Sequence, residues 1–311
     1  MRLIHGGTAM QLGFVSAILP ELSLEEVLRF AADEGFACVE VMCWPPGKTD
    51  RRYSGVSHIN VAEMTDDYAG HIRELVRMHG VSISALGYYP NPLDADLDCR
   101  RFVGEHLRKV IRAAARIGVG LVNTFIGRDP HQSIEGNWPS FRAVWTEIVR
   151  HAEGEGVNIG IENCPMLFSA DEWPGGKNLA VSPVVWQLIF EEISSPRLGL
   201  NFDPSHLIWQ HIDYVRAIRD FGRRILHVHA KDTRVDYEQL GRVGIMGLGW
   251  HSAKLPGLGD VAWGQFFSAL TDVGYEGAIC IEVEDRAFEN SLKDRKRALL
   301  QSKRFLDQFI S

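Results

Sequence analysis

Three carboxylates and a histidine each stand at the end of a short apolar segment. Glu162 follows Ile-Gly-Ile, Asp203 follows Leu-Gly-Leu-Asn-Phe, Glu282 follows Ala-Ile-Cys-Ile, and His229 ends Ile-Leu-His-Val-His. One such acidic residue is usually a helix cap or a solvated loop residue. Three carboxylates and one imidazole together form the hard, oxygen-rich ligand set of a divalent metal site. A divalent cation would also remove the mutual repulsion of the carboxylates.

The segment that carries His229 reads as a strand. Alternation places His227, His229 and Lys231 on one side and the apolar residues between them on the other. His227 lies one layer deeper than His229, which favours a packed, hydrogen-bonded histidine. For Lys231, contact with a substrate oxygen and a salt bridge with Asp232 are both open.

Strand and helix signals alternate along the whole sequence. Helix punctuation includes a capping box of Ser23 and Glu26, and Ser182-Pro183 as an N-cap followed by proline. Asp260 is a candidate helix cap. The candidate strands are residues 12–17, 38–42, 82–86, 121–125, 158–162, 199–203, 225–229 and 278–282.

Eight such units predict an α/β fold, a (β/α)8 barrel. A doubly wound open sheet is the alternative, but no Gly-x-Gly-x-x-Gly follows the first strand. We expect residues 1–10 to form a flexible N-terminal segment and residues 11–311 to form a single barrel domain.

The barrel would bring the four candidate ligands together. Glu162, Asp203, His229 and Glu282 would project from the carboxyl ends of four neighbouring strands, where barrel active sites are built. The loops of residues 44–64, 88–98, 163–182 and 233–260 follow strands on the same face and predict a binding mouth.

Composition narrows the class of protein. The chain has 311 residues, 45% of them apolar and 23% charged, as in ordinary globular proteins. A formal charge of −7 argues against nucleic acid as a partner. No apolar run is long enough to span a membrane, and five scattered cysteines suit reduced thiols. We therefore expect a cytoplasmic enzyme.

At this point several motifs resemble the xylose-isomerase-like superfamily of sugar phosphate isomerases and epimerases, over nearly the whole chain. The motifs are Ile161-Glu162-Asn163-Cys164-Pro165, Asn201-Phe202-Asp203-Pro204-Ser205-His206, His227-Val228-His229-Ala230-Lys231-Asp232, Pro256-Gly257-Leu258-Gly259-Asp260 with Trp263, and Gly274-Tyr275-Glu276-Gly277 before Glu282.

The resemblance implies a site as well as a fold. It places one divalent ion per chain, Mn²⁺ first and Mg²⁺, Co²⁺ or Zn²⁺ as alternatives, on Glu162, Asp203, His229 and Glu282. It implies that His206 contacts substrate and that Glu162 and Glu282 act as an acid/base pair. Because relatives are often dimers or tetramers, a homo-oligomer is the assembly to test.

The activity implied is isomerisation or epimerisation of a ketose or keto-sugar, phosphorylated or glycosidic, through a metal-stabilised cis-enediolate. Trp44 and Tyr88 stand near the expected mouth, where aromatic faces could stack on a sugar. Glu40 is open between a buried partner for His227 and a substrate contact.

Other functions compete with this one. Removal of the proton next to a carbonyl, the step that forms an enediolate, also permits β-elimination. A keto-polyol or inosose dehydratase is therefore the first alternative. An apurinic endonuclease-like metal hydrolase would need further histidines and an Asp-x-His after His229, where the sequence has Lys231-Asp232-Thr233-Arg234. A non-catalytic barrel would not need an intact ligand set.

Overall fold

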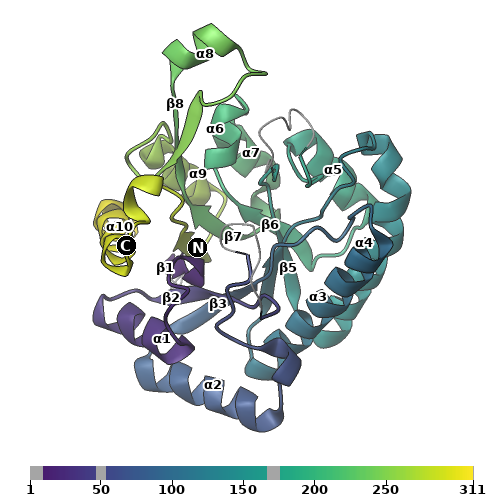
Figure 1. Cartoon of the computed structure of the whole chain (residues 1–311), viewed down its shortest axis with the longest axis vertical. Helices are drawn as coiled ribbons and strands as arrows, with labels where there is room; N and C mark the ends of the chain where they lie inside the picture. Colours follow the sequence, from purple (N-terminus) through teal and green to yellow (C-terminus); the bar gives the residue numbers. More distant parts are fainter. Residues whose placement is uncertain (1–9, 47–53, 167–175, 311) are drawn as a thin grey trace, which may run out of the picture.

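The strands form a closed parallel barrel in a computed structural model that describes residues 10–46, 54–166 and 176–310 (Figure 1). Its order is β1-β10-β7-β6-β5-β4-β3-β2, with β1 pairing both β2 and β10. The barrel strands are β1 (Gln11–Val15), β2 (Cys38–Met42), β3 (Ser82–Gly87), β4 (Leu121–Thr124), β5 (Asn158–Glu162), β6 (Leu198–Phe202), β7 (Ile225–Ala230) and β10 (Ala278–Ile281). Each predicted strand is present, which confirms the single (β/α)8 barrel.

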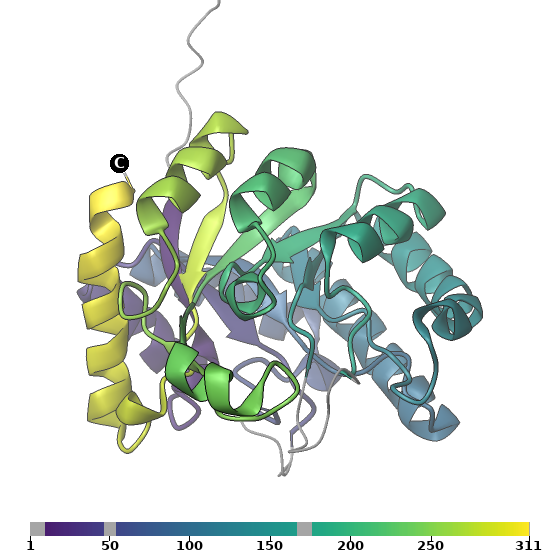
Figure 2. The ribbon, with the colours of Figure 1, turned by 90° about the horizontal axis from the view of Figure 1, so that it is seen from above.

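Helices surround these strands (Figure 2). They are α1 (Leu24–Asp33), α2 (Asp66–His79), α3 (Leu97–Ile117), α4 (Ile134–Glu155), α5 (Pro183–Glu192), α6 (Ser205–Trp209), α7 (Tyr214–Phe221), α8 (Tyr237–Val243), α9 (Trp263–Asp272) and α10 (Leu292–Leu306). The flexible segment expected at residues 1–10 lies outside the described residues, apart from Met10.

Local chemistry sets where these helices begin and end. Ser23 and Glu26 form the predicted capping box of α1. Gly80 and Gly118 end α2 and α3 with φ values of 66° and 82°, which glycine adopts without steric cost. Pro183 starts α5, although the Ser182 side chain makes no capping hydrogen bond.

Alternation sorts the barrel side chains as predicted. On β7, His227 and His229 point into the barrel and contact residues of other strands, while Val228 packs in the hydrophobic core. The interior is crowded: a Cβ added at Gly160 would lie 2.3 Å from Oδ1 of Asn123. Polar side chains therefore fill this part of the barrel, and they must satisfy one another.

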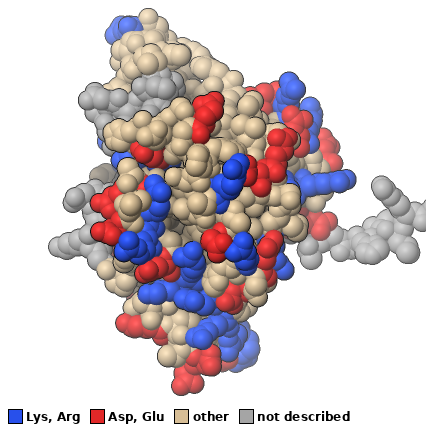
Figure 3. All heavy atoms as spheres, turned by 90° about the vertical axis from the view of Figure 1, so that its right-hand side faces the viewer, with Lys and Arg blue, Asp and Glu red and all other residues tan. Residues whose placement is uncertain are grey.

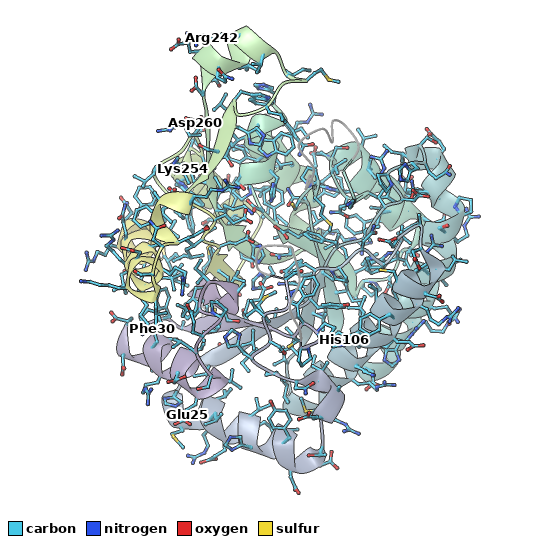
Figure 4. The ribbon with its side chains drawn as sticks, viewed as in Figure 1. Glu25, Phe30, His106, Arg242, Lys254 and Asp260 are labelled. Carbon is cyan, nitrogen blue, oxygen red and sulfur yellow. The ribbon has the colours of Figure 1, made fainter. Side chains whose placement is uncertain are left out.

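The expected loop 233–260 contains more structure than its composition indicates. β8 (Asp232–Val235) and β9 (His251–Lys254) pair as an antiparallel hairpin that carries α8. In Figure 4, Arg242 lies at the far end of this arm, and Lys254 and Asp260 lie nearer the barrel.

The prediction that Asp260 caps a helix was wrong. Its carboxylate accepts the backbone N–H of Val235 at 2.7 Å, and the residue before α9 is Ala262. Asp260 thus ties the start of the arm to the loop that follows the arm.

Charged side chains of both signs are mixed on the surface. On the described part of the face in Figure 3, acidic and basic side chains are interspersed. Among the described residues, no helix is both long and apolar enough to cross a membrane.

Candidate metal centre and substrate cavity

The four predicted ligands meet at the carboxyl ends of β5, β6, β7 and β10. One ligand atom from each of Glu162, Asp203, His229 and Glu282 lies within 4.8 Å of every other. Asp203 and His229 are fully buried, and Glu162 is 3% exposed. Neighbouring parallel strands deliver these side chains from one edge of the barrel, as parity predicts.

His229 is oriented by the two nitrogens of its ring. Nε2 lies 2.8 Å from Oε2 of Glu40, so this nitrogen carries the proton and donates it. Nδ1 faces Oε1 of Glu162 and Oε2 of Glu282, each at 3.5 Å, and has no hydrogen-bond partner in the described part of the chain. A buried Nδ1 that faces two carboxylates, on a ring held in place through Nε2, is the arrangement of a metal-ligating histidine.

Glu40 is a further acidic residue of the barrel interior, and the structure defines the role that the sequence left open. It is fully buried, accepts hydrogen bonds from Tyr89 Oη and from Asn123 Nδ2 (3.0 Å), and lies closer to His229 than to His227, whose Nδ1 is 3.7 Å away. Glu40 therefore supports the candidate ligand His229. Sequence parity placed Glu40 inside the barrel but did not identify this partner.

His227 is the packed histidine that the sequence predicts. Nδ1 lies 3.0 Å from Oδ1 of Asn201, and Nε2 lies 3.1 Å from Oγ of Ser84. Both ring nitrogens are therefore used within the protein.

Lys231 pairs with carboxylates of the site rather than with Asp232. Its Nζ lies 2.6 Å from Oε2 of Glu282, and 3.1 Å from both Asp203 Oδ2 and Glu284 Oε2. The carboxylate of Asp232 instead accepts backbone N–H groups, including that of Gly257 at 2.9 Å, and the indole N–H of Trp263.

His206 approaches the cluster from α6, just after β6. Its Nε2 lies 3.3 Å from Asp203 Oδ2 and 3.6 Å from Glu162 Oε1. The other oxygen of Asp203 accepts the backbone N–H of Ser205 at 2.8 Å, which fixes the carboxylate.

These contacts shift the acid–base balance of the carboxylates. Burial alone would raise the pKa of Glu282, but the charges of Lys231 and His229 outweigh it and lower this pKa to about 2. Burial alone would also raise the pKa of Glu162, but the close His206 and His229 rings and the charge of Lys231 outweigh it and lower this pKa. Both groups are therefore ionised at neutral pH.

A cavity of about 790 Å³ opens over this cluster. Glu162, His206, Lys231 and Glu282 line its polar side. The rest of the wall is largely apolar and aromatic, with Val15, Ile18, Met42, Trp44, Phe125 and Trp209. Polar groups converging within an apolar wall are typical of small-molecule sites.

Of the two aromatic residues predicted at the binding mouth, one lines this cavity and the other does not. Trp44 lines it, whereas Tyr88 is buried beside Trp44 and His106, with ring centroids 4.9 and 4.7 Å away, and does not line it. The next residue, Tyr89, lines the cavity instead. Trp209 also lines it and stacks on His251 of the arm at 4.7 Å.

Comparison with known proteins identifies the family. Residues 28–309 match the profile described as xylose isomerase-like TIM barrel, and the chain belongs to this family. The uncharacterized protein YfiH of Bacillus subtilis is 25% identical over 300 residues, covering 89% of this chain and 93% of that protein. An inosose dehydratase of Geobacillus thermodenitrificans is 30% identical over 118 residues, covering 35% of this chain and 39% of that protein.

Solved structures share the fold at low identity. A D-psicose 3-epimerase, crystallised in the presence of D-fructose, superposes with a TM-score of 0.71 at 15% identity, covering 96% of this chain and 99% of that one. The IOLI protein with a binding zinc atom gives 0.71 at 18% identity, covering 96% and 98%.

Proposed function

We propose that this protein is a divalent-metal-dependent isomerase or epimerase of a ketose or keto-sugar. The observation that carries the proposal is the set of Glu162, Asp203, His229 and Glu282, of which the first three are buried and Glu282 is partly buried, beneath an open cavity. The set fits a metal, because Nδ1 of His229 is buried without a hydrogen bond among the described residues while its Nε2 is held by Glu40. The zinc in the similarly folded IOLI protein is consistent with this proposal.

A divalent ion held by these residues would act as a Lewis acid on a substrate carbonyl and favour loss of the neighbouring proton. Mn²⁺ is the first candidate, with Mg²⁺, Co²⁺ and Zn²⁺ as alternatives, because oxygen ligands dominate the set. Metal analysis of protein purified without chelators should find about one divalent ion per chain. Its absence, with no ion taken up on titration, would contradict the proposal.

Glu162 and Glu282 are the proposed acid/base pair. Both are ionised at neutral pH, so either carboxylate could accept a proton from substrate carbon. Their surroundings differ: Glu162 faces His206, whereas Glu282 contacts Lys231. One carboxylate could remove a proton and the other could return one, as an epimerase requires.

Other side chains would position the substrate. His206 and Lys231 reach the cavity with polar nitrogens suited to sugar oxygens, and Trp44 offers an aromatic wall. Tyr88 would act indirectly, because it packs against Trp44. A cytoplasmic location and a homo-oligomeric assembly stay predictions.

A dehydratase of a keto-polyol such as an inosose is the second candidate. The local match to inosose dehydratases, 30% identity over 118 residues for one of them, favours it. The same base and metal would serve, because a proton next to a carbonyl leaves in both reactions. The two differ in whether a hydroxyl group is then expelled.

One screen separates the two reactions. Ketoses, keto-glycosides, inososes and their phosphates are incubated with Mn²⁺-loaded protein in D2O and followed by NMR. Isomerisation and epimerisation give deuterium at carbon with the formula otherwise retained, whereas dehydration removes water. Turnover of none of these substrates would contradict both candidates.

Glu162→Gln and Glu282→Gln test the acid/base pair, with Glu147→Gln on the surface of α4 as the matched control. Each site variant should lose about 10²–10⁴-fold in the rate of deuterium incorporation. Metal content is measured in parallel, because both residues are also proposed ligands. Wild-type exchange in both site variants would exclude their role.

A further inference from the structure

Lys231 occupies a place in the site that an ordinary structural salt bridge does not explain. Its side chain is 3% exposed, and its ammonium group lies 2.6–3.1 Å from oxygens of Asp203, Glu282 and Glu284. An ammonium group has three donors, and here it faces three carboxylates. The nearest acidic residue in sequence, Asp232, is occupied by backbone N–H groups and Trp263.

Two of these three carboxylates belong to the candidate metal set. The Lys231 contacts use Asp203 Oδ2 and Glu282 Oε2, and the latter also faces His229 Nδ1 at 3.5 Å. A divalent ion on this set would therefore share carboxylates with a fixed positive charge. Like charges that share ligands in a buried site repel each other strongly.

Glu284 gives an independent indication of the same role. It lies two residues beyond Glu282, lines the cavity and contacts Lys231, but it is not in the four-ligand set. One divalent ion on that set does not require this carboxylate. A second cation between Asp203, Glu282 and Glu284 does require it.

A further group is directed at the same place. Nε2 of His206 lies 3.3 Å from Oδ2 of Asp203. This nitrogen is buried without a hydrogen bond among the described residues, and His206 as a whole is 9% exposed. The three carboxylates around the ammonium group, together with this imidazole beside Asp203, again form a divalent-metal ligand set.

We propose that Lys231 is a built-in second cation, which keeps the centre at one divalent ion and weakens the hold on that ion. This inference rests on the proposed metal dependence. It gives the lysine a role in metal stoichiometry and affinity rather than in proton transfer.

The test measures metal binding and needs no substrate. Mn²⁺ is titrated by equilibrium dialysis with elemental analysis, and its electron paramagnetic resonance spectrum is recorded. Wild type and Lys231→Arg, which retains the charge, should bind one ion with an uncoupled spectrum. Lys231→Ser removes the charge and leaves room, so it should bind two ions with a spin-coupled spectrum.

Lys231→Met keeps most of the volume and removes the charge. It should bind a single ion roughly tenfold more tightly than wild type, because the repulsion is gone. Arg286→Met is the matched control, since Arg286 also lines the cavity, and its change should be smaller. If Lys231→Ser does not fold, as judged by near-ultraviolet circular dichroism, Lys231→Met decides.

The outcomes are distinct. A second ion in Lys231→Ser, or a tighter single ion in Lys231→Met, supports the proposal. One ion at unchanged or weaker affinity in both variants overturns it. Failure of wild type to bind any divalent ion would contradict the proposed function itself, whereas wild-type behaviour of both variants would remove only this inference.

Discussion

Two polar clusters lie inside the same barrel at different depths. The inner cluster comprises Glu40, Tyr89, Asn123, Asn201 and His227, and the rim cluster comprises Glu162, Asp203, His206, Lys231 and Glu282. In the inner cluster, side chains bond mainly to one another: Asn123 and Tyr89 donate to Glu40, and Asn201 faces His227. In the rim cluster, His206 Nε2 lacks a hydrogen bond among the described residues, and Asp203 Oδ2 forms an ion pair with Lys231 Nζ at 3.1 Å.

The difference separates support from chemistry. Most polar atoms of the inner cluster are hydrogen-bonded, although Oδ1 of Asn123 has no hydrogen-bond partner among the described residues, and such a buried network makes the core rigid. A buried nitrogen such as His206 Nε2, which has no hydrogen bond among the described residues and whose side chain lines the cavity, is available to a partner from outside the chain. His229 joins the two clusters, because Nε2 bonds to Glu40 and Nδ1 faces the rim carboxylates.

The two histidines of β7 give the largest expected contrast. His229→Gln should reduce Mn²⁺ affinity by more than about 100-fold, which is the upper range for removing a supporting residue, because it removes a ligand. His227→Gln, two residues earlier on the same strand, should lower stability but retain the metal. Isothermal titration calorimetry and thermal unfolding measure the two effects. Equal metal loss in both variants would contradict the division.

Glu40→Gln tests whether the inner cluster serves the rim. The variant keeps the shape of the side chain but loses the charge that holds Nε2–H of His229. Metal affinity should fall about 10–100-fold, with the ligand set itself unchanged. Asn123→Asp is not a suitable control, since it adds a charge. Tyr89→Phe removes one hydrogen bond to the same carboxylate and should have a smaller effect.

The sequence predicted much of this division and missed specific parts of it. Alternation along β7 placed His227, His229 and Lys231 inside the barrel, because strand period is local. The partner of Glu40 depends on contact across the barrel between β2 and β7, which are not paired strands, so no local pattern reports it. The arm was read as a loop because its tip, residues 241–249, is rich in glycine.

Tyr88 and Tyr89 also show where local sequence pattern stops being informative, because it does not decide which of the two lines the cavity. β3 ends at Gly87, and the register between β2 and β3 shifts at Val39/Glu40. Beyond the strand, alternation no longer determines which side chain faces the cavity. The sequence therefore located an aromatic residue at the mouth but selected the neighbour of the one that lines it.

The pH dependence of metal binding tests whether His229 connects the inner cluster to the rim cluster. Burial would lower the pKa of His229, but Glu40 and Glu282 outweigh burial and raise this pKa well above 6.5 in the metal-free protein. Metal must displace the Nδ1 proton, so affinity should rise with pH up to that raised pKa. Below it, affinity should fall by about tenfold for each unit of pH.

Calorimetry in buffers of different ionisation enthalpy measures the released proton directly. In Glu40→Gln the raised pKa should move down, so the pH at which affinity levels off should also move down. A metal affinity that stays constant over roughly pH 6 to 9 would show that no proton leaves on metal binding.

Ser84→Ala should have the smallest effect on stability, and the effect should be limited to the inner cluster. Its hydroxyl lies 3.1 Å from Nε2 of His227 and 3.4 Å from Sγ of Cys280. Loss of this hydrogen bond should lower the free energy of unfolding by about 1 kcal/mol, because the histidine nitrogen keeps only the weak thiol donor of Cys280, 3.5 Å away. Mn²⁺ affinity should not change, since His229 and Glu40 keep their contacts. Urea unfolding with and without Mn²⁺ measures both quantities. If the free energy of Mn²⁺ binding changes more than the free energy of unfolding, the two clusters are coupled by more than His229 alone.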